Sequence, residues 1–332
     1  MVSGGSSDLR RDGVDLSDRL FVVFNPASGR GRGARLQQKY VDLLRGAGLD
    51  CEVAETRAPG DERRLTLQAL DQGFTSIVAV GGDGTWSHVA DALLGSGSPG
   101  LRFGVLPAGT GNDFGRNLGL DHRRPDLCVE VLAQGRTRQI DVGRVRTPSR
   151  RAEPGQPAAG EPSVRHFLNV VGLGFDVGVI DAAAGARFLR GEALYQITAL
   201  QQLFRFPGVT CTAESRSEPV AERSGRFLMV TVSNGAVFGG GFPIAPHAAI
   251  DDGCLHACFI GDASPFGRAR LFTAAGKGRH GLLNGVFFEA STGFVLRTDD
   301  RTRFEVDGDV YEATGSSVEV DLLPGALEVF AP

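Results

Sequence analysis

The sequence predicts an α/β domain followed by a mainly antiparallel β domain. Over about the first 135 residues, short apolar runs alternate with helix-patterned stretches, as in a parallel sheet covered by helices. After Gln134, strand-like runs separated by turns predominate, as in an antiparallel sheet. The 332 residues suffice for two domains of ordinary size. We therefore predict an α/β domain at 19–135, joined by the last strands at 316–331, and a β-rich domain at 136–315.

In the first domain, four segments are expected to form parallel strands. Three are continuous apolar runs, as strands buried on both faces require: Leu20–Phe24, Ser76–Val80 and Arg102–Leu106. The fourth is Cys51–Glu55, which is followed by Thr56. Two helices between them are indicated by apolar residues that share a helical face, namely Leu36, Tyr40, Leu43 and Ala47, and Trp86, Val89, Ala90, Leu93 and Leu94. In such an open sheet, ligands are expected at the carboxyl ends of the strands.

In the second domain, further segments are expected to be strands because turn residues flank them. They are Arg138–Arg146, Val164–Val171, Val209–Glu214, Arg226–Val232, Cys254–Ile260, Gly293–Arg297 and Thr302–Val306. Thr147–Pro162 is rich in proline, glycine and alanine. We expect it to be a mobile excursion between two strands, without a part in the chemistry.

Composition excludes several classes of protein. The formal net charge of −4 gives no basic footprint for nucleic acid. Lysine occurs only at Lys39 and Lys277, so a Walker-type P-loop with its Gly-Lys-Ser/Thr sequence is excluded. The five cysteines lack a metal-ligand spacing and favour a reducing compartment. Met1–Asp18 lacks the apolar core of a signal peptide, and we expect a cytoplasmic protein that can still touch the inner face of the membrane.

The most informative motif is Gly81–Thr85, Gly-Gly-Asp-Gly-Thr, which joins the run Ser76–Val80 to a helix-patterned stretch. Glycines let the backbone approach a polyphosphate, and the start of a helix adds the positive end of its dipole. Asp83 would repel phosphate unless a divalent cation bridges the two, or unless backbone donors and a substrate hydroxyl hold the carboxylate. The motif therefore indicates chemistry on a phosphate.

Two further loops follow predicted strands, Asn25–Gly29 and Pro107–Asp113. Because the carboxyl ends of parallel strands meet at one edge, these loops and Thr56 are expected to converge on a crevice that can hold a nucleotide. Asn-Pro-x-Ser-Gly alone is also ordinary turn chemistry. The three glycine loops at three strand ends together favour a functional interpretation.

With these motifs the chain resembles the bacterial diacylglycerol-kinase-type lipid kinases, whose catalytic domain also occurs in sphingosine and ceramide kinases. The resemblance extends from about Phe21 to Val329 and depends on the order of the motifs. Besides the three loops, these are Asn234-Gly235, Phe238–Gly241, Asp251–Gly253 and Val306–Asp309. NAD kinases and phosphofructokinases also carry a Gly-Gly-Asp-Gly loop, whereas Pro107–Asp113 discriminates in favour of the lipid kinases.

The resemblance implies transfer of the γ-phosphoryl group of ATP to a lipid hydroxyl with Mg²⁺, in a cleft between the α/β domain and a β-sandwich. The implied nucleotide-binding residues are Asn25, Pro26, Ser28, Gly29, Thr56, Gly81, Gly82, Asp83, Gly84, Thr85, His88, Gly109, Thr110, Asn112 and Asp113. Asp83 would also organise the magnesium region, and Asp307 would be the general base. Asp309 occupies the glutamate position of the family's Asp-Gly-Glu motif. Asp251 and Asp252 lie in a segment that helps to hold a structural magnesium ion.

Two of these assignments have structural alternatives. Val306–Asp309 has the sequence of a β-turn between strands, and Asp251–Gly253 has the sequence of a turn before a strand. The chain also departs from the family pattern at three places. Ser87-His88 replaces a common Asn-Glu, so that no glutamate closes a capping box with Thr85. Asp309 is one methylene shorter than glutamate, and His247 stands where an acidic residue is common.

The acceptor is the least readable feature. Phe188–Phe206 is rich in aromatic residues and would either admit an acyl chain or belong to the hydrophobic core. Arginines in and beside this segment could contact anionic headgroups, namely Arg187, Arg190 and Arg205. We expect a lipid substrate presented at a membrane surface, and the sequence leaves open whether the chain forms a homodimer. A kinase of a soluble acceptor such as NAD, and a catalytically silent nucleotide- or lipid-binding module, remain as alternatives.

Overall fold

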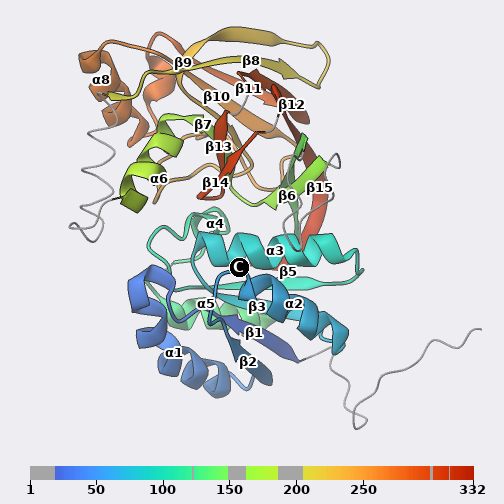
Figure 1. The fold of residues 1–332 in the computed structure, drawn as a ribbon. Coiled ribbons are helices and arrows are strands. Elements are labelled where there is room, and N and C mark those ends of the chain that lie inside the picture. The colour runs from blue at the N-terminus through green and yellow to red at the C-terminus, as the bar shows by residue number, and fades with distance from the viewer. Residues whose placement is uncertain (1–18, 122, 149–161, 186–204, 300–301, 314) are drawn as a thin grey trace, which may run out of the picture. The chain divides into compact units, whose positions relative to one another are not determined.

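The computed structural model describes residues 19–121, 123–148, 162–185, 205–299, 302–313 and 315–332. The chain forms two compact units (Figure 1). Unit 1 consists of Met1–Gly109, Leu120–Arg138 and Leu327–Pro332, and unit 2 of Thr110–Gly119 and Gln139–Ala326. No helix among the described residues is long and apolar enough to cross a membrane.

Unit 1 is built on a parallel sheet. Its strands are β1 (Leu20–Phe24), β2 (Cys51–Glu55), β3 (Ser76–Gly81) and β4 (Arg102–Pro107), in the spatial order β4-β3-β1-β2. The helices are α1 (Ser28–Gly46), α2 (Asp61–Asp71), α3 (Asp83–Ser96) and α5 (Pro125–Gln134). Helix α2 packs with α3 on one face of the sheet, and α1 packs with α5 on the other (Figure 1). This is the predicted α/β architecture.

The core of unit 1 follows the apolar runs. All residues of β1 and β3 are buried, and Trp86, Val89 and Leu93 bury the predicted face of α3. Helix α1 differs from expectation, because it buries Tyr40 and Leu44 and leaves Ala47 exposed. The reason is a close contact at Gly33, where an added Cβ would lie 2.2 Å from the carbonyl oxygen of Asn25. The face through Gly33, Tyr40 and Leu44 therefore points inward.

Unit 2 is mainly antiparallel. Its strands are β5 (Thr137–Pro148), β6 (Pro162–Phe167), β7 (Val170–Gly174), β8 (Val209–Ser215), β9 (Glu222–Ser233), β10 (Leu255–Gly261), β11 (Val286–Ser291), β12 (Gly293–Thr298), β13 (Arg303–Val306), β14 (Asp309–Glu312) and β15 (Ser317–Phe330). Neighbouring strands along β14-β13-β7-β9-β8-β12-β15 are antiparallel. Strands β10 and β11 extend from β9, and β5 and β6 pair beside β15. The last residues of β15 belong to unit 1, where Glu328 and Val329 pair in parallel with β4.

Helices cover part of unit 2. They are α4 (Asp113–Asn117), α6 (Phe175–Gly185), α8 (Pro265–Ala275) and the 3₁₀ helix η1 (His280–Leu282). One apolar cluster lies on the face of β9 and β10 that carries Val230 and Phe259, and a second cluster includes Cys258 of β10 and Leu271 of α8. The five cysteines are all free, and burial raises the pKa of the Cys211 thiol to about 12.

Most predicted strands are present, with one instructive difference. The segment Val164–Val171 is divided into β6 and β7 at Leu168-Asn169. The backbone N–H groups of both residues donate to the carboxylate of Asp307, 138 or more positions away in the sequence. Because this contact is long-range, the local pattern of apolar and turn residues did not indicate that the predicted strand is interrupted. Most of the predicted excursion Thr147–Pro162 and most of Phe188–Phe206 lie outside the described residues.

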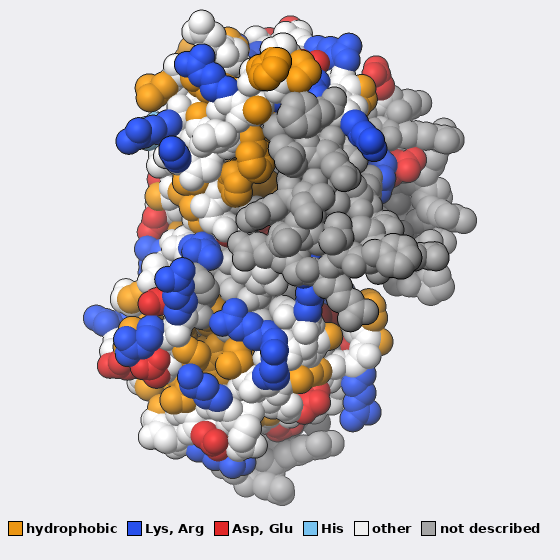
Figure 2. All heavy atoms as spheres, turned by 90° about the vertical axis from the view of Figure 1, so that its left-hand side faces the viewer, with side chains coloured by type: hydrophobic (Ala, Val, Ile, Leu, Met, Phe, Trp, Pro, Cys, Tyr) orange, Lys and Arg blue, Asp and Glu red, His pale blue; other side chains and the backbone are white. Residues whose placement is uncertain are grey.

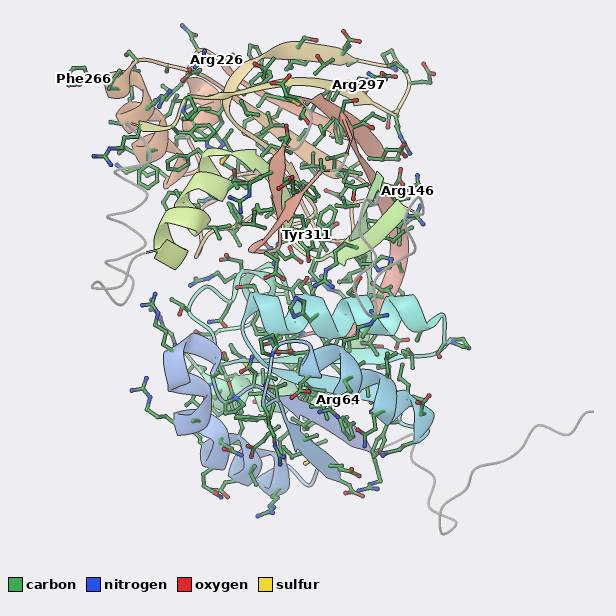
Figure 3. The ribbon with its side chains drawn as sticks, in the orientation of Figure 1. Arg64, Arg146, Arg226, Phe266, Arg297 and Tyr311 are labelled. Atoms are coloured by element: carbon green, nitrogen blue, oxygen red, sulfur yellow. The ribbon has the colours of Figure 1, made fainter. Side chains whose placement is uncertain are left out.

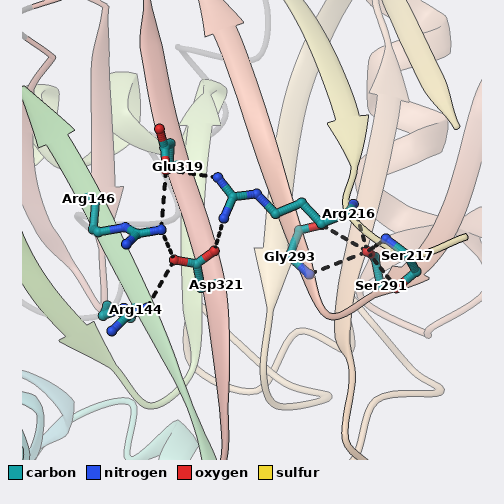
Figure 4. Close-up of polar contacts among 8 residues, drawn as sticks. All are labelled: Arg144, Arg146, Arg216, Ser217, Ser291, Gly293, Glu319 and Asp321. Atoms are coloured by element: carbon teal, nitrogen blue, oxygen red, sulfur yellow. Dashed lines mark hydrogen bonds and ion pairs between the residues drawn. The ribbon is translucent and has the colours of Figure 1, made fainter. Parts of the chain in front are cut away.

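A network of ion pairs joins three strands or strand ends of unit 2 (Figure 4). Asp321 of β15 binds Arg146 of β5 at 2.6 Å, Arg144 at 3.3 Å, and also Arg216, which follows β8. Glu319 binds Arg216 at 2.8 Å. Two carboxylates thus neutralise most of the charge of three arginines, and we assign the network a structural role.

Candidate active site

Four loops leave the sheet of unit 1 at the same edge. In the strand register, Phe24 pairs with Glu55 and Val80, and Val80 pairs with Leu106. The residues that follow, Asn25, Thr56, Gly82 and Ala108, therefore start their loops side by side. Backbone hydrogen bonds continue past the strands, from Asn25 N to Val80 O at 2.9 Å and from Thr56 N to Phe24 O at 2.8 Å. The starts of the four loops are thus neighbours, as expected, and the nucleotide-binding crevice stays a prediction.

Asn25 ties these loops together through its side chain. Its Nδ2 donates to Thr85 Oγ1 at 2.9 Å and to Glu62 Oε1 at 3.2 Å. Its Oδ1 accepts from the backbone N–H groups of Ala27 and Ser28 at 3.0 and 3.1 Å. Glu62, in the first turn of α2, is a site residue that the sequence prediction missed. The residue is 6% exposed, and its Oε2 has no hydrogen-bond partner among the described residues.

Three glycines let these loops pack closely. A Cβ at Gly29, whose φ is +56°, would lie 2.3 Å from Ala108 O. A Cβ at Gly82 would lie 2.9 Å from Gly109 Cα, and one at Gly81 would lie 2.5 Å from the side chain of Thr85. Gly84 is different, because a Cβ there meets nothing within 4 Å. Close packing therefore explains why glycine is needed at Gly29, Gly81 and Gly82. At Gly84, in contrast, the glycine leaves the backbone of the first turn of α3 accessible to a ligand.

Gly84 lies in the first turn of α3, close to the N-terminus of this helix. Gly82 is its N-cap, no side chain caps it, and the first helical hydrogen bond runs from Trp86 N to Gly82 O at 3.0 Å. The preceding N–H groups and the helix dipole favour an anion here. Asp83 and His88 are both half-buried on this helix, and Thr85 is buried. Thr85 is the third residue of α3 and not its N-cap, so it does not stand where a capping box with position 88 would need it.

The loop Pro107–Asp113 contributes to both units. Ala108 N and Gly109 N both donate to Gly81 O, at 2.6 and 2.9 Å, within unit 1. Thr110 is exposed, whereas Asn112 and Asp113 are buried in unit 2. Oδ2 of Asp113 accepts from Gly240 N at 2.8 Å. Asp113 therefore anchors the glycine run Phe238–Gly241, and the predicted ATP cleft between the domains stays a prediction.

A tight hairpin turn joins β13 and β14. Asp307 (φ +47°) and Gly308 (φ +93°) form it, as the structural alternative for this motif expected. Oδ2 of Asp307 accepts from Leu168 N at 2.7 Å, and Oδ1 accepts from Asn169 N at 2.9 Å and from Val170 N at 3.0 Å. Asp307 is 6% exposed, whereas the Asp309 side chain is 45% exposed, with Arg165 Nη2 at 3.9 Å.

Below this turn lies a pair of buried acids that the sequence prediction missed. Glu305 of β13 lies opposite Gly172 of β7, and Asp176 is in the first turn of α6. A Cβ at Gly172 would lie 1.7 Å from Asp176 Oδ2 and 3.0 Å from Glu305 Cγ, so the glycine makes room for the acids. Oε2 of Glu305 accepts from Gly308 N at 2.9 Å.

Burial sets the protonation of this pair. It raises the pKa of Asp176 to about 7, against 3.8 for an ordinary aspartate. The pKa of Glu305 also lies well above its usual value, first because of burial and then because of the nearby charge of Asp176. Two neighbouring buried carboxylates do not both ionise at low cost, so burial and the nearby charge both favour the protonated forms. Among the described residues, both oxygens of Asp176 and Oε1 of Glu305 have no hydrogen-bond partner.

In the predicted second metal segment, hydrogen bonds within the protein hold the carboxylate of Asp252. Oδ1 of Asp252 accepts from Cys254 N at 3.0 Å, and Oδ2 accepts from Ala249 N at 2.9 Å and lies 2.9 Å from His256 Nε2. Three protein groups thus contact the two carboxylate oxygens, and the role of Asp252 in binding a metal ion stays a prediction. Asp251 and His247 are exposed. Across the described ranges, no group of three or more His, Cys, Asp or Glu side chains has a metal-binding arrangement.

Comparisons with known proteins cover almost the whole chain. Residues 19–145 match the family model of the diacylglycerol kinase catalytic domain. Residues 169–331 match the model named YegS C-terminal NAD kinase beta sandwich-like domain. The two models together account for the α/β and the β-rich parts of the chain.

Individual relatives agree with these matches. The chain is 28% identical to a diacylglycerol kinase of Mycobacterium tuberculosis strain H37Rv over 98% of both chains. It is 30% identical to a "Probable lipid kinase YegS-like" of Pseudomonas aeruginosa strain UCBPP-PA14 over 95% of both chains. A diacylglycerol kinase structure from Bacillus anthracis strain Sterne superimposes with a TM-score of 0.66 at 18% identity, covering 95% of this chain and 97% of that one, which shows the shared fold.

Proposed function

Because the chain belongs to the bacterial family of diacylglycerol-kinase-type lipid kinases, we propose that it transfers the γ-phosphoryl group of ATP to a lipid hydroxyl. The observation that carries the proposal is the open backbone at Gly84, at the N-terminus of α3. There, four loop starts meet at one edge of the sheet. Packing gives no reason for a glycine at this position, whereas the approach of a phosphate does.

Phosphoryl transfer mainly requires positioning and neutralisation of charge. The N–H groups of the first turn of α3 would bind the phosphates. Asn25 would hold Thr85 and the first loop in place through its hydrogen bonds at both ends of the amide. Asp83 would hold Mg²⁺, which neutralises phosphate charge when it is bound.

The transfer also needs a group that accepts the proton of the acceptor hydroxyl. Asp307 was the first candidate from sequence, but three backbone donors already occupy its two oxygens. Asp309, two residues further along the same hairpin, has a half-exposed carboxylate. We therefore propose that Asp309 accepts the proton and that Asp307 holds the hairpin in position.

The test is an assay with γ-labelled ATP, Mg²⁺ and a total lipid extract. We expect label in an organic-soluble product, and mass spectrometry of that product identifies the acceptor among diacylglycerol, phosphatidylglycerol, a sphingoid base and other long-chain alcohols. The Asp309→Asn variant should lose transfer while retaining ATP binding. Label no higher than in an Asp83→Asn control would contradict the proposal, and ATP binding without any single-turnover transfer would indicate a silent module.

A second candidate is a kinase of a soluble acceptor such as NAD. One observation favours this candidate: the family model that matches residues 169–331 is described as NAD kinase beta sandwich-like. This candidate predicts a phosphorylated product in the aqueous phase. It fails if the protein phosphorylates lipid and gives no turnover with NAD.

A further inference from the structure

Two hydrophobic side chains of unit 2 are almost fully exposed. Phe266 at the start of α8 is 91% exposed, and Leu282 in η1 is 82% exposed. They exceed every other large hydrophobic side chain among the described residues, of which the next, Val220, is 53% exposed. Phe266 projects outward from α8 (Figure 3). Helix α8 and η1 contact each other, and we call the exposed side of these two elements the α8–η1 surface.

The α8–η1 surface is also cationic. Between Ala263 and Phe288 the sequence contains four Lys or Arg residues and no Asp or Glu, in a chain of net charge −4. Phe266, Arg270 and Thr273 are exposed at spacings of four and three residues, which places them on one face of α8, and the exposed Lys277 follows the C-cap of the helix, Gly276. Figure 2 shows hydrophobic and basic side chains next to one another on this side of unit 2.

Internal contacts hold this surface in place. Arg268, on the inner side of α8, donates to Asp262 Oδ1 at 3.1 Å and to Phe206 O at 2.8 Å. Ser264 caps the helix by accepting from Gly267 N at 3.3 Å. Leu271 is buried beneath the helix, and His280 Nε2 lies 3.1 Å from Ile244 O beneath η1. The outward position of Phe266 is therefore fixed by a capped and anchored helix.

The nearby acid does not cancel the positive charge. Asp262, which immediately precedes the segment, is paired with Arg268 and with Arg226. Arg270, Lys277 and Arg279 thus remain as exposed cations around two exposed apolar side chains. A surface of this composition fits an anionic lipid bilayer, since apolar side chains enter the interface and cations meet headgroup phosphates.

We propose that the α8–η1 surface docks the protein onto an anionic lipid bilayer. Phe266 and Leu282 enter the interface, and Arg270, Lys277 and Arg279 contact the headgroups. The inference deepens the proposed function, because a kinase whose acceptor is a lipid has to reach the bilayer that contains it. The vesicle assay below does not depend on catalysis, so the two proposals can fail separately.

The test is cosedimentation with phosphatidylcholine vesicles that contain or lack phosphatidylglycerol. Wild-type protein should bind only the anionic vesicles and should be released by salt. Each of the single variants Arg270→Gln, Lys277→Gln and Arg279→Gln removes one positive charge and should weaken vesicle binding about fivefold. Phe266→Ser and Leu282→Ser should each weaken it about tenfold. Matched controls elsewhere, Val220→Ser and Lys39→Gln, should bind like wild type.

Three outcomes would overturn the inference. The first is wild-type protein that does not bind anionic vesicles, and the second is full binding by the Phe266→Ser/Leu282→Ser variant. The third is dimerisation in analytical ultracentrifugation that this double variant abolishes, because the surface would then join two copies of the chain. Turnover with a short-chain lipid in detergent should be unchanged in all surface variants. Vesicle binding without any kinase activity would contradict only the proposed function.

Discussion

At the scale of single residues, the hairpin between β13 and β14 carries two aspartates in different environments. Asp307 is buried and accepts three backbone hydrogen bonds, whereas the Asp309 side chain is half-exposed. A buried carboxylate whose oxygens are all used stabilises a turn, because its removal leaves several N–H donors without a partner. The carboxylate of Asp309 on the same turn is reached by solvent, with Arg165 Nη2 at 3.9 Å.

Substitution of these two aspartates should therefore separate activity from stability. Asp309→Asn should lower kcat by about 10²–10⁴-fold, the usual contribution of a general base, with an unchanged melting temperature. Asp307→Ala should lower the free energy of unfolding by about 3 kcal/mol, because three backbone N–H groups lose their acceptor. Steady-state kinetics and thermal denaturation measure the two effects. A fully active Asp309→Asn variant would return the role of base to Asp307.

The buried pair of Asp176 and Glu305 predicts a pH dependence of stability. The pKa of Asp176 is about 7 in the folded protein, against 3.8 for an ordinary aspartate. Between these values the folded state binds more protons at Asp176 than the unfolded state does, so the stability that this residue contributes falls as pH rises and is lost above about pH 7. The raised pKa of Glu305 acts in the same direction.

The Asp176→Asn variant should show this effect by difference. Its stability relative to wild type should increase as pH rises between 3.8 and about 7, by an amount on the order of a few kcal/mol. Urea denaturation at several pH values measures it, with the exposed Asp42→Asn as the matched control. A stability difference that does not change with pH would show that Asp176 is ionised in the folded protein.

At the scale of elements, the loop between β3 and α3 combines glycines with different roles. Gly82 makes a close contact with Gly109, whereas Gly84 faces open space. The sequence identified this loop because its glycines follow a buried strand and precede a helix, which are local features. It did not distinguish the two roles, because that distinction depends on which loop lies opposite.

Alanine substitutions at these two glycines should have opposite signatures. Gly82→Ala should destabilise the protein, since its Cβ would lie 2.9 Å from Gly109 Cα. Gly84→Ala should preserve or raise stability by up to about 1 kcal/mol, because alanine favours a helix, yet it should weaken ATP binding. Calorimetry with ATP and thermal denaturation measure both properties. Unchanged ATP affinity in Gly84→Ala would remove the main support for phosphate binding at this helix.

At the scale of the whole molecule, β15 links the two units, because it pairs with β12 in unit 2 and with β4 in unit 1. The order of the strands of unit 1 and of helices α1 and α3 could be predicted, since apolar runs and turn residues are local signals, whereas α2, α5 and the helices of unit 2 were not predicted. The break at Leu168-Asn169 and the pair of Asp176 and Glu305 could not, because both depend on contacts of β13 with distant segments. The predicted inward face of α1 was wrong for a different reason, because Gly33 packs against the backbone of the loop just before the helix, at Asn25 and Pro26.

Magnesium should not be needed for the fold. The oxygens of Asp252 are occupied by two backbone N–H groups and His256, so the ATP-free protein should melt at the same temperature in EDTA and in Mg²⁺. Differential scanning fluorimetry checks this, with Asp252→Asn as the companion variant. Stabilisation by Mg²⁺ that disappears in Asp252→Asn would show that the segment binds the ion after all.

The central claim is that phosphate passes from ATP to a lipid, and a paired labelling experiment tests it most directly. The purified protein is incubated with Mg²⁺ and a lipid extract, in one sample with γ-labelled ATP and in the other with α-labelled ATP. We predict that label enters the organic phase only from the γ-labelled nucleotide, and that Asp309→Asn prevents it. Label that stays in the aqueous phase with both nucleotides would contradict the claim.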